Sequence, residues 1–314
     1  MGGGAAVVML MLGLAATASA ATVRDGHPVM GTVLAVTVVA ADAAAAHALT
    51  DAAFAAARHW DDVLTTWRPE GELARLNARA GSGPVPISPD LAAALRQMVA
   101  LAAATDGGFD PAVGPLVQCW RGPAAPLPPP PASAATRVAT ALTLDGGTAA
   151  LVAGAALDAG GIGKGIALDA MAALLRQGGA QAAFLDFGGS SQLAFGEPDA
   201  AGGGWRVALG GLAAGTMLGE MSLHDAALST SRASSGPNQA GPIIDPRSGA
   251  PVFTPRLATV RAADATTAEA WTKALVVLGG AAVPVAARAG VAVLFEDAEG
   301  VLRDGFPLVA LPAR

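Results

Sequence analysis

Asp158-Ala-Gly-Gly-Ile-Gly-Lys164-Gly-Ile-Ala-Leu-Asp169 is the segment around which this chain is organised. A short apolar run, residues 155–157, comes directly before it, and four glycines surround Lys164. Apolar residues then recur at helical spacing, at Ala167, Ala170, Met171, Leu174 and Leu175. The pattern predicts a strand, a tight loop and a helix, followed after Gly178-Gly179 by a buried strand over Ala182–Phe187 that brings Asp186 to the pair Gly188-Gly189.

The composition of this loop favours an anionic ligand. Glycines let backbone N–H groups approach an anion closely, and the first turn of a helix adds unpaired N–H donors. Lys164 contributes a full positive charge. We therefore expect the loop to hold phosphate, the alternative being that the glycines only turn a strand into a helix.

Two common phosphate-binding motifs do not match this loop. A P-loop requires glycine where Asp158 stands and a hydroxyl residue where Gly165 stands. The dinucleotide fingerprint fails as well, because Gly161, Gly163 and Gly165 are separated by single residues and no early strand begins a clear βαβ repeat. The sequence therefore favours neither a P-loop nor a Rossmann fold.

The rest of the chain predicts an α+β protein with mostly antiparallel sheets and flanking helices. Alternation and periodicity predict strands over 30–39, 205–209, 216–221, 226–231 and 258–263, a hairpin of 291–296 with 301–303, and helices over 42–67, 88–105 and 267–278. Residues 109–120, rich in proline, glycine and aromatic residues, favour a shaped loop. The proline-rich residues 121–135 favour a polyproline-leaning surface segment.

Composition limits the class of protein. The 314 residues are 53% hydrophobic, much of it alanine, so one large domain or two interlocked ones could bury a core. The formal net charge is −6 and there is no basic run, which gives no support for a nucleic-acid partner.

The amino terminus has the features of an export signal. Residues 5–18 form an apolar segment that is shorter than the ~20 residues a membrane helix needs, and Ala18-Ser19-Ala20 matches the small-residue cleavage pattern. We expect residues 1–20 to be a cleaved signal peptide and the protein to be periplasmic or otherwise exported, with 21–314 as the mature domain. An ordinary buried helix is the alternative. The lone Cys119 cannot form an internal disulfide.

Seven separated blocks of this sequence together resemble the ApbE family. They cover about residues 27 to 311 in the family's order: Met30-Gly31-Thr32; Thr66-Trp67-Arg68 with Glu72 and Asn77; Gly108-Phe109-Asp110 with Gly114-Pro115-Leu116-Val117 and Trp120; Gly160–Gly165; Asp186-Phe187-Gly188-Gly189; Leu228–Ser231; and Ile244–Gly249. The resemblance implies an α+β fold of its own kind and an FAD:protein FMN transferase. Such enzymes pass FMN from FAD to a Thr or Ser hydroxyl of a target protein, commonly a membrane redox subunit, and release AMP with Mg²⁺ on the diphosphate.

The resemblance also assigns roles to individual residues. Lys164 and Asp245 would be catalytic, with Lys164 on the diphosphate. FAD would be bound by Met30, Trp67, Gly108, Phe109, Asp110, Asp158, Lys164 and Ile243, with Met30 and Trp67 at the flavin. Metal-ligand positions of the family fall on Gly161, Glu269 and Lys273.

Three positions depart from the family's pattern. Pro242 stands where the family has histidine, Arg232 stands where it has glycine, and Lys273 stands at a metal-ligand position although a charged ammonium has no lone pair to offer. Glu269 and Lys273 share one helix face, so they could point into the metal site or form a solvated ion pair. The departures leave two alternatives open: an exported FAD-binding protein with impaired transfer, and an FAD pyrophosphatase that gives FMN and AMP.

Overall fold

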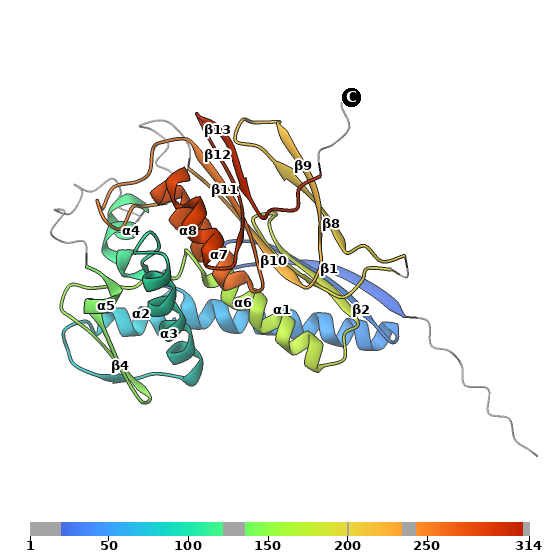
Figure 1. Ribbon diagram of the computed structural model, residues 1–314. Helices are drawn as coiled ribbons and strands as arrows, with labels where there is room; N and C mark the ends of the chain where they lie inside the picture. Colours follow the sequence, from blue (N-terminus) through green and yellow to red (C-terminus); the bar gives the residue numbers. More distant parts are fainter. Residues whose placement is uncertain (1–19, 122–135, 200, 234–242, 310–314) are drawn as a thin grey trace, which may run out of the picture.

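The computed structural model describes residues 20–121, 136–199, 201–233 and 243–309. Residues 1–19 of the expected signal peptide, residues 122–135 of the expected polyproline-leaning segment, and Pro242 lie outside the described residues. Helices and antiparallel sheets are mixed along the chain, which confirms the predicted α+β class (Figure 1).

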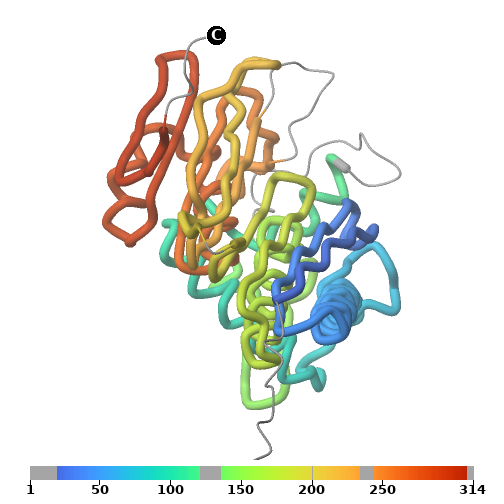
Figure 2. The backbone as a smooth tube through the Cα atoms, turned by 90° about the vertical axis from the view of Figure 1, so that its right-hand side faces the viewer, coloured from blue at the N-terminus to red at the C-terminus, as the bar shows by residue number. Residues whose placement is uncertain are grey.

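An eight-stranded antiparallel sheet forms the centre of the fold, in the order β1-β2-β6-β7-β10-β11-β12-β13. Figure 2 shows β1 and β2 (blue) at one end of this sheet and β12 and β13 (red) at the other. The strands are β1 (Ala21–Val29), β2 (Thr32–Ala40), β6 (Ala182–Phe187), β7 (Ser191–Phe195), β10 (Ala226–Ala233), β11 (Arg256–Ala262), β12 (Ala292–Asp297) and β13 (Gly300–Asp304).

Two layers cover this sheet. One face packs against α1 (Ala43–Leu64), α6 (Gly163–Gln177), α7 (Ala265–Leu278) and α8 (Val283–Arg288), and the other against the hairpin of β8 (Trp205–Gly210) and β9 (Met217–Leu223) (Figure 1). Strand alternation explains the division, since Leu185 and Phe187 join the helix-side core while Phe184 stacks on Trp205 of the hairpin. None of the described helices is long and apolar enough to cross a membrane.

A second apolar cluster lies beside the helix layer. It is built by α2 (Glu72–Ala78), α3 (Pro89–Ala104), α5 (Val138–Ala141) and a small sheet of β3 (Val85–Pro86), β5 (Thr148–Leu151) and β4 (Leu142–Asp145). Leu73, Leu95 and Met98 are fully buried in it. The 3₁₀ turn η1 (Pro111–Val113) and α4 (Gly114–Arg121) connect this cluster to the rest of the chain.

Capping side chains set the helix starts that the sequence predicted. Asp42 accepts a hydrogen bond from the Ala45 amide at the start of α1. Ser88 caps α3 at the Leu91 amide, with Pro89 in the first turn, and Glu72 in turn accepts hydrogen bonds from the amide and hydroxyl of Ser88. The predicted helices over 42–67 and 88–105 are therefore confirmed to within a few residues.

Two of the predicted segments take a different structure, and the strand β1 was not predicted. Residues 155–157 are not a strand, because their backbone pairs with unrelated groups: the Ala156 carbonyl accepts from Gly114 N–H, and Leu157 bonds the Asn77 side chain through both its N–H and its carbonyl. The predicted loop over 109–120 is largely helical, as η1 and α4, and Asp110 caps η1 at the Ala112 amide.

Helices α6 and α7 approach each other closely at their first turns. A Cβ atom on Gly165 would lie 2.7 Å from the Ala265 carbonyl oxygen, so only glycine fits there. Asp169 of α6 then caps α7 from outside, accepting from the amides of Ala265 (2.7 Å) and Thr266 (3.0 Å) and from the Thr266 hydroxyl (2.6 Å). Residue 165 and Asp169 therefore fix where α7 begins.

Replacing Asp169 with alanine should lower the free energy of unfolding by about 1–3 kcal/mol, because the amide donors of α7 lose their acceptor. Urea unfolding followed by far-UV circular dichroism measures the change. Asp51→Ala, which removes an exposed carboxylate from α1, is the matched control and should stay within about 0.5 kcal/mol of the original chain. Equal effects of the two substitutions would contradict the capping role.

The same carboxyl gives a pH dependence. Burial raises the pKa of Asp169 to about 6, against the lowering effect of its hydrogen bonds to Thr266 and Ala265. The folded protein then binds this proton more tightly than the unfolded chain, so the contribution to stability is present below pH ~4 and lost as the pH rises through about 6. Asp169→Asn does not titrate, so its free energy of unfolding should rise relative to that of the original chain as the pH increases from 4 to 7. A difference between the two proteins that stayed constant over this range would refute the assignment.

Candidate functional site

Two adjoining cavities open around the start of α6, of about 340 and about 420 Å³. Asp158, Gly160 and Lys164 line both of them. The first cavity is otherwise lined by Gly108, Phe109, Asp110, Val113, Val117, Gly161, Thr230, Ser231, Arg232, Ile243, Ile244, Pro246 and Lys273. The second is otherwise lined by Met30, Gly31, Asp61, Leu64, Thr65, Thr66, Trp67, Arg68, Ala159 and Gly163.

The fold thus gathers nearly every residue that the sequence singled out. Gly108, Phe109, Asp110, Asp158, Gly161, Lys164, Ile243 and Lys273 line the first cavity, and Met30 and Trp67 line the second. Glu269 lies beside them, fully buried, at the side of the two lysines. Asp245 lines neither cavity, although its neighbours Ile244 and Pro246 line the first.

Several backbone amides of the glycine loop already have acceptors within the protein. The Gly160 amide donates to Asp158 Oδ1 at 2.8 Å. The amides of Ile162 and Gly163 donate to the Ala159 carbonyl, and the Gly165 amide donates to Glu269 Oε2 at 2.9 Å. The Gly165 amide at the start of α6 is therefore satisfied by a carboxylate of the protein itself.

Glu269 is a fully buried carboxylate with polar partners on both oxygens. Besides the Gly165 amide on Oε2, the Ser191 hydroxyl donates to Oε1 at 2.5 Å. The ammonium groups of Lys164 and Lys273 lie 3.7 and 3.9 Å from the same Oε1. Two positive charges therefore face one negative charge, and the cluster keeps a net positive charge toward the first cavity.

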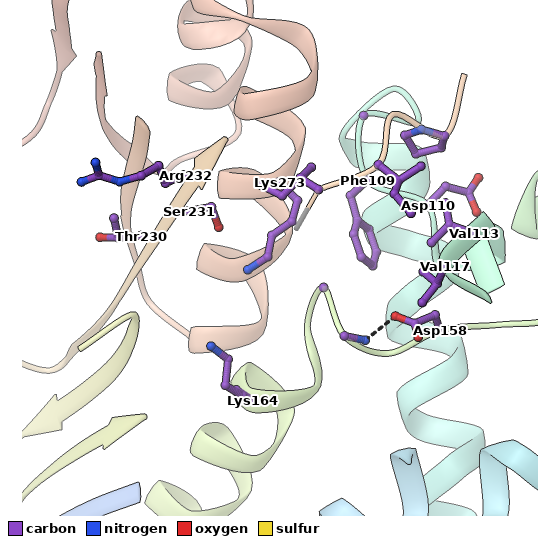
Figure 3. Close-up of a pocket in the computed structure, with 16 residues that line it drawn as sticks. Phe109, Asp110, Val113, Val117, Asp158, Lys164, Thr230, Ser231, Arg232 and Lys273 are labelled. Carbon is purple, nitrogen blue, oxygen red and sulfur yellow. Dashed lines mark hydrogen bonds between the residues drawn. The ribbon is translucent and has the colours of Figure 1, made fainter. Parts of the chain in front are cut away.

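The two lysines are held differently. Lys164 donates to the Ser190 hydroxyl at 2.8 Å, whereas Lys273 makes no hydrogen bond through its ammonium within the described part of the chain. Burial lowers the pKa of Lys273 to about 8, opposed by the attraction of Glu269 and assisted by repulsion from Lys164. Figure 3 shows both amino groups directed into the space between α6 and α7.

Lysine is scarce in this protein. The sequence has nineteen Lys and Arg residues in total, and Lys164 and Lys273 are its only lysines. Both line the first cavity. A lysine ammonium is a compact charge with three donors, whereas an arginine guanidinium is a planar fork, so the two are not equivalent in a narrow site.

The residues at the expected metal-ligand positions do not fit Mg²⁺. Magnesium takes oxygen ligands in an octahedral arrangement, and Lys273 brings a positive charge where a ligand oxygen is required. Both Glu269 oxygens already accept hydrogen bonds. Among the described residues no group of three or more His, Cys, Asp or Glu side chains could hold a metal ion.

The wall of the first cavity opposite the lysines is formed by Phe109, Asp110 and Asp158. A Cβ atom on Gly161 would lie 2.9 Å from the Phe109 ring, so this glycine lets the loop pack against the ring. Burial raises the pKa of Asp110, opposed by hydrogen bonds from the Ala112 and Val138 amides. Asp158 accepts from the Thr66 hydroxyl at 3.4 Å, which joins the walls of the two cavities.

The second cavity offers an exposed indole. Trp67 follows α1 and is 58% exposed, which is unusual for so large an apolar side chain. Its neighbour Arg68 is tied back to Asp61 and Asp62 at 2.9 and 2.6 Å. Met30, at the turn between β1 and β2 with φ +50°, forms another part of the wall. An aromatic ring system can stack here.

Two residues that the sequence singled out, Asp245 and Arg232, have partners of their own within the protein. Asp245 forms a two-pronged ion pair with Arg247; burial works to raise the pKa of Asp245, but these hydrogen bonds outweigh it and lower the pKa. Arg232 lines the first cavity, but its guanidinium donates to the carbonyls of Gly211 and Leu212 and points away from the lysines (Figure 3). It therefore adds no charge beside them.

Sequence reasoning missed the hydroxyl groups that position the charges. Ser190 accepts from Lys164 and Ser191 donates to Glu269. Both follow directly after the pair Gly188-Gly189, where the turn between β6 and β7 delivers them. The only available signal was the polar run Gly-Gly-Ser-Ser between two buried strands.

Replacing Glu269 with alanine should lower the free energy of unfolding by about 3–5 kcal/mol, since it leaves two ammonium groups and the Gly165 amide without their shared partner. Thermal and urea unfolding measure the loss. Adding Lys273→Met to this variant should recover part of it. The exposed Glu299→Ala is the matched control, and a Glu269 variant as stable as this control would rule out the buried charge cluster.

Comparison with known proteins extends these findings. The family model described as "ApbE family" matches residues 30–295. A Treponema pallidum (strain Nichols) FAD:protein FMN transferase is 31% identical over 201 residues, 59% of this chain and 56% of that protein. A Klebsiella pneumoniae (strain 342) protein of the same name is 38% identical over 106 residues, 34% of this chain and 30% of that protein. These alignments span about a third to just over half of the relatives' length.

Solved structures share the fold over most of the chain. The apo form of the Pseudomonas stutzeri flavinyl transferase ApbE superposes with a TM-score of 0.80 at 23% identity, covering 91% of this chain and 95% of that one. The Vibrio cholerae flavin transferase ApbE superposes with a TM-score of 0.76 at 24% identity, covering 91% and 97%. With the family model matching from the β1–β2 turn to β12, this chain belongs to the ApbE family.

Proposed function

We propose that this protein is an FAD:protein FMN transferase, which moves FMN from FAD to a Thr or Ser hydroxyl of a target protein and releases AMP. The observation that carries the proposal is the pair of cavities that meet at Lys164. FAD consists of two ring systems joined by a diphosphate, so a cationic group between two cavities matches its shape and its charge. Both volumes are in the range of small-molecule sites.

The arrangement of the cavities suggests an orientation for the ligand. The flavin ring would stack on Trp67 beside Met30 in the second cavity, where an aromatic face is exposed. The adenosine half would enter the first cavity, between Phe109 and Ile243. Its polar groups would meet Asp110 and Asp158, and the diphosphate would lie at Lys164.

The proposed reaction is a displacement at the phosphorus atom of the FMN half. The acceptor hydroxyl gives up its proton to solvent and forms a new P–O bond. The bond from this phosphorus to the bridging oxygen breaks, and AMP leaves with that oxygen and its electron pair. In such transfers the protein mainly positions the groups and stabilises developing negative charge. Lys164, held by Ser190 and close to Glu269, would neutralise charge on the diphosphate and on the departing phosphate.

The acceptor and the compartment are further parts of the proposal. A signal peptide over residues 1–20 would deliver the domain 21–314 outside the cytoplasm, where the acceptor would be a Thr- or Ser-bearing subunit of a membrane redox complex. The small-residue pattern Ala18-Ser19-Ala20 supports export. Edman sequencing of protein recovered from the periplasm tests it, with Ala21 as the expected first residue.

Incubation with FAD and an acceptor that carries the threonine motif should give a flavin-labelled band and one AMP for each flavin transferred. Lys164→Met should weaken FAD binding about 10- to 100-fold, because a charge-assisted contact to the diphosphate is lost. Arg288→Met, which removes an exposed cation of α8, is the matched control and should bind like the original chain. Fluorescence titration of FAD and chromatography of AMP provide the measurements.

The same assay separates the two alternatives. AMP released without any acceptor would identify an FAD pyrophosphatase. Tight FAD binding with no AMP in either mixture would identify an exported flavin-binding protein without transfer activity, an alternative suggested by the lysine at position 273. Absence of FAD binding would refute all three.

A further inference from the structure

The ammonium of Lys273 has free hydrogen-bond donors that face the first cavity. Its side chain is 17% exposed, and its one ionic partner within the described residues is Glu269 at 3.9 Å, beyond hydrogen-bond distance. An ammonium carries three N–H donors, and a largely buried charge is costly unless it is paired and hydrogen-bonded. The cavity beside it is the place where an anion could supply those partners.

The pair Glu269–Lys273 is not a solvated ion pair on a helix surface. Glu269 is 0% exposed, and its oxygens already accept from the Gly165 amide and the Ser191 hydroxyl. These neutral donors satisfy the carboxylate without using the donors of Lys273. The attraction of Glu269 therefore holds the ammonium in place and leaves its N–H groups available to a ligand.

Lys164 and Lys273 flank the same carboxylate oxygen, at 3.7 and 3.9 Å, from two different helices. One anion in the first cavity can therefore reach both ammonium groups, while the amides of Gly160 and Gly165 are already engaged. Two fixed positive charges supply the neutralisation that a diphosphate commonly receives from one lysine and one divalent cation.

We propose that Lys273 replaces a divalent cation in this site, so that Lys164 and Lys273 together hold the diphosphate of the ligand without metal. The proposal rests on the proposed function, because it takes the diphosphate of FAD as the natural anion. It adds that neither binding nor transfer requires Mg²⁺ in this protein, and it makes Lys273 a residue that touches the substrate.

FAD affinity with and without a divalent cation tests the proposal. Flavin fluorescence is titrated on the full chain and on Lys273→Met, Lys273→Thr and the control Arg288→Met, in EDTA and in Mg²⁺. The original chain and the control should bind equally in both buffers. Lys273→Met should lose about 10- to 100-fold in affinity in EDTA, and Lys273→Thr, which replaces the cation with an oxygen ligand, should recover affinity when Mg²⁺ is added.

Lysine-selective NMR gives a readout that is independent of activity. Because the sequence has only two lysines, protein labelled with ¹³C at the lysine side chains should show two Cε signals. The variants Lys164→Met and Lys273→Met assign each signal to its residue. Both signals of the original chain should shift when FAD or inorganic diphosphate is added in EDTA. If the Lys164 signal moved on addition of these ligands and the Lys273 signal did not, the proposal would be overturned.

The outcomes separate this proposal from the proposed function. A requirement of the original chain for Mg²⁺ in FAD binding, or unchanged affinity of Lys273→Met in EDTA, overturns metal replacement while the transferase assignment stands. FAD binding of equal affinity in EDTA and in Mg²⁺, with no transfer in either buffer, overturns the transferase assignment and supports the lysine pair. Shifts of both lysine signals with diphosphate, but not with FAD, support the pair and reject FAD as its ligand.

Discussion

The buried carboxylate of Glu269 is the interaction on which the rest of the site depends. It joins three elements of the fold, because it extends from α7, accepts from the first turn of α6 through Gly165, and accepts from the start of β7 through Ser191. A lone buried carboxylate would be costly, and here hydrogen bonds and two neighbouring ammonium groups compensate for burial. The protein itself therefore holds the charges of the site in position, which reduces the cost of binding a ligand.

The glycines of the loop have a structural role besides the one that the sequence indicated. Glycines, a helix start and a lysine in one stretch indicated an anion site, and the cavities do meet at that stretch. The glycines, however, serve packing: residue 161 makes room for the Phe109 ring and residue 165 for the backbone of α7. The Gly165 amide of this stretch binds Glu269, which lies 104 residues further along the chain. No local pattern reveals such a partner.

Much of the fold could be predicted because its signals are local. Helical periodicity from Asp42 and the Ser88-Pro89 start marked two helices, and a short buried-type run marked the strand Ala182–Phe187 with its observed bounds. Strand β1 was missed, since this edge strand is mostly exposed and shows no apolar alternation. The helical character of residues 111–121 was missed because proline and glycine outweighed a short helical pattern. Within the site, the ordered blocks located the cavity residues, whereas the contacts of Asp245, Arg232, Ser190 and Ser191 depend on tertiary neighbours.

The scarcity of lysine has a practical consequence at the bench. Apart from the chain's amino terminus, the primary amines of this protein lie in one cavity, on side chains that are 24% and 17% exposed. Dyes, biotin esters and sensor surfaces that couple through lysine amines would therefore attach at the ligand site. Coupling through the single thiol, Cys119 on α4, or through an added tag leaves these lysines unmodified. Conversely, the extent to which an amine reagent modifies the two lysines reports whether a ligand occupies the cavity.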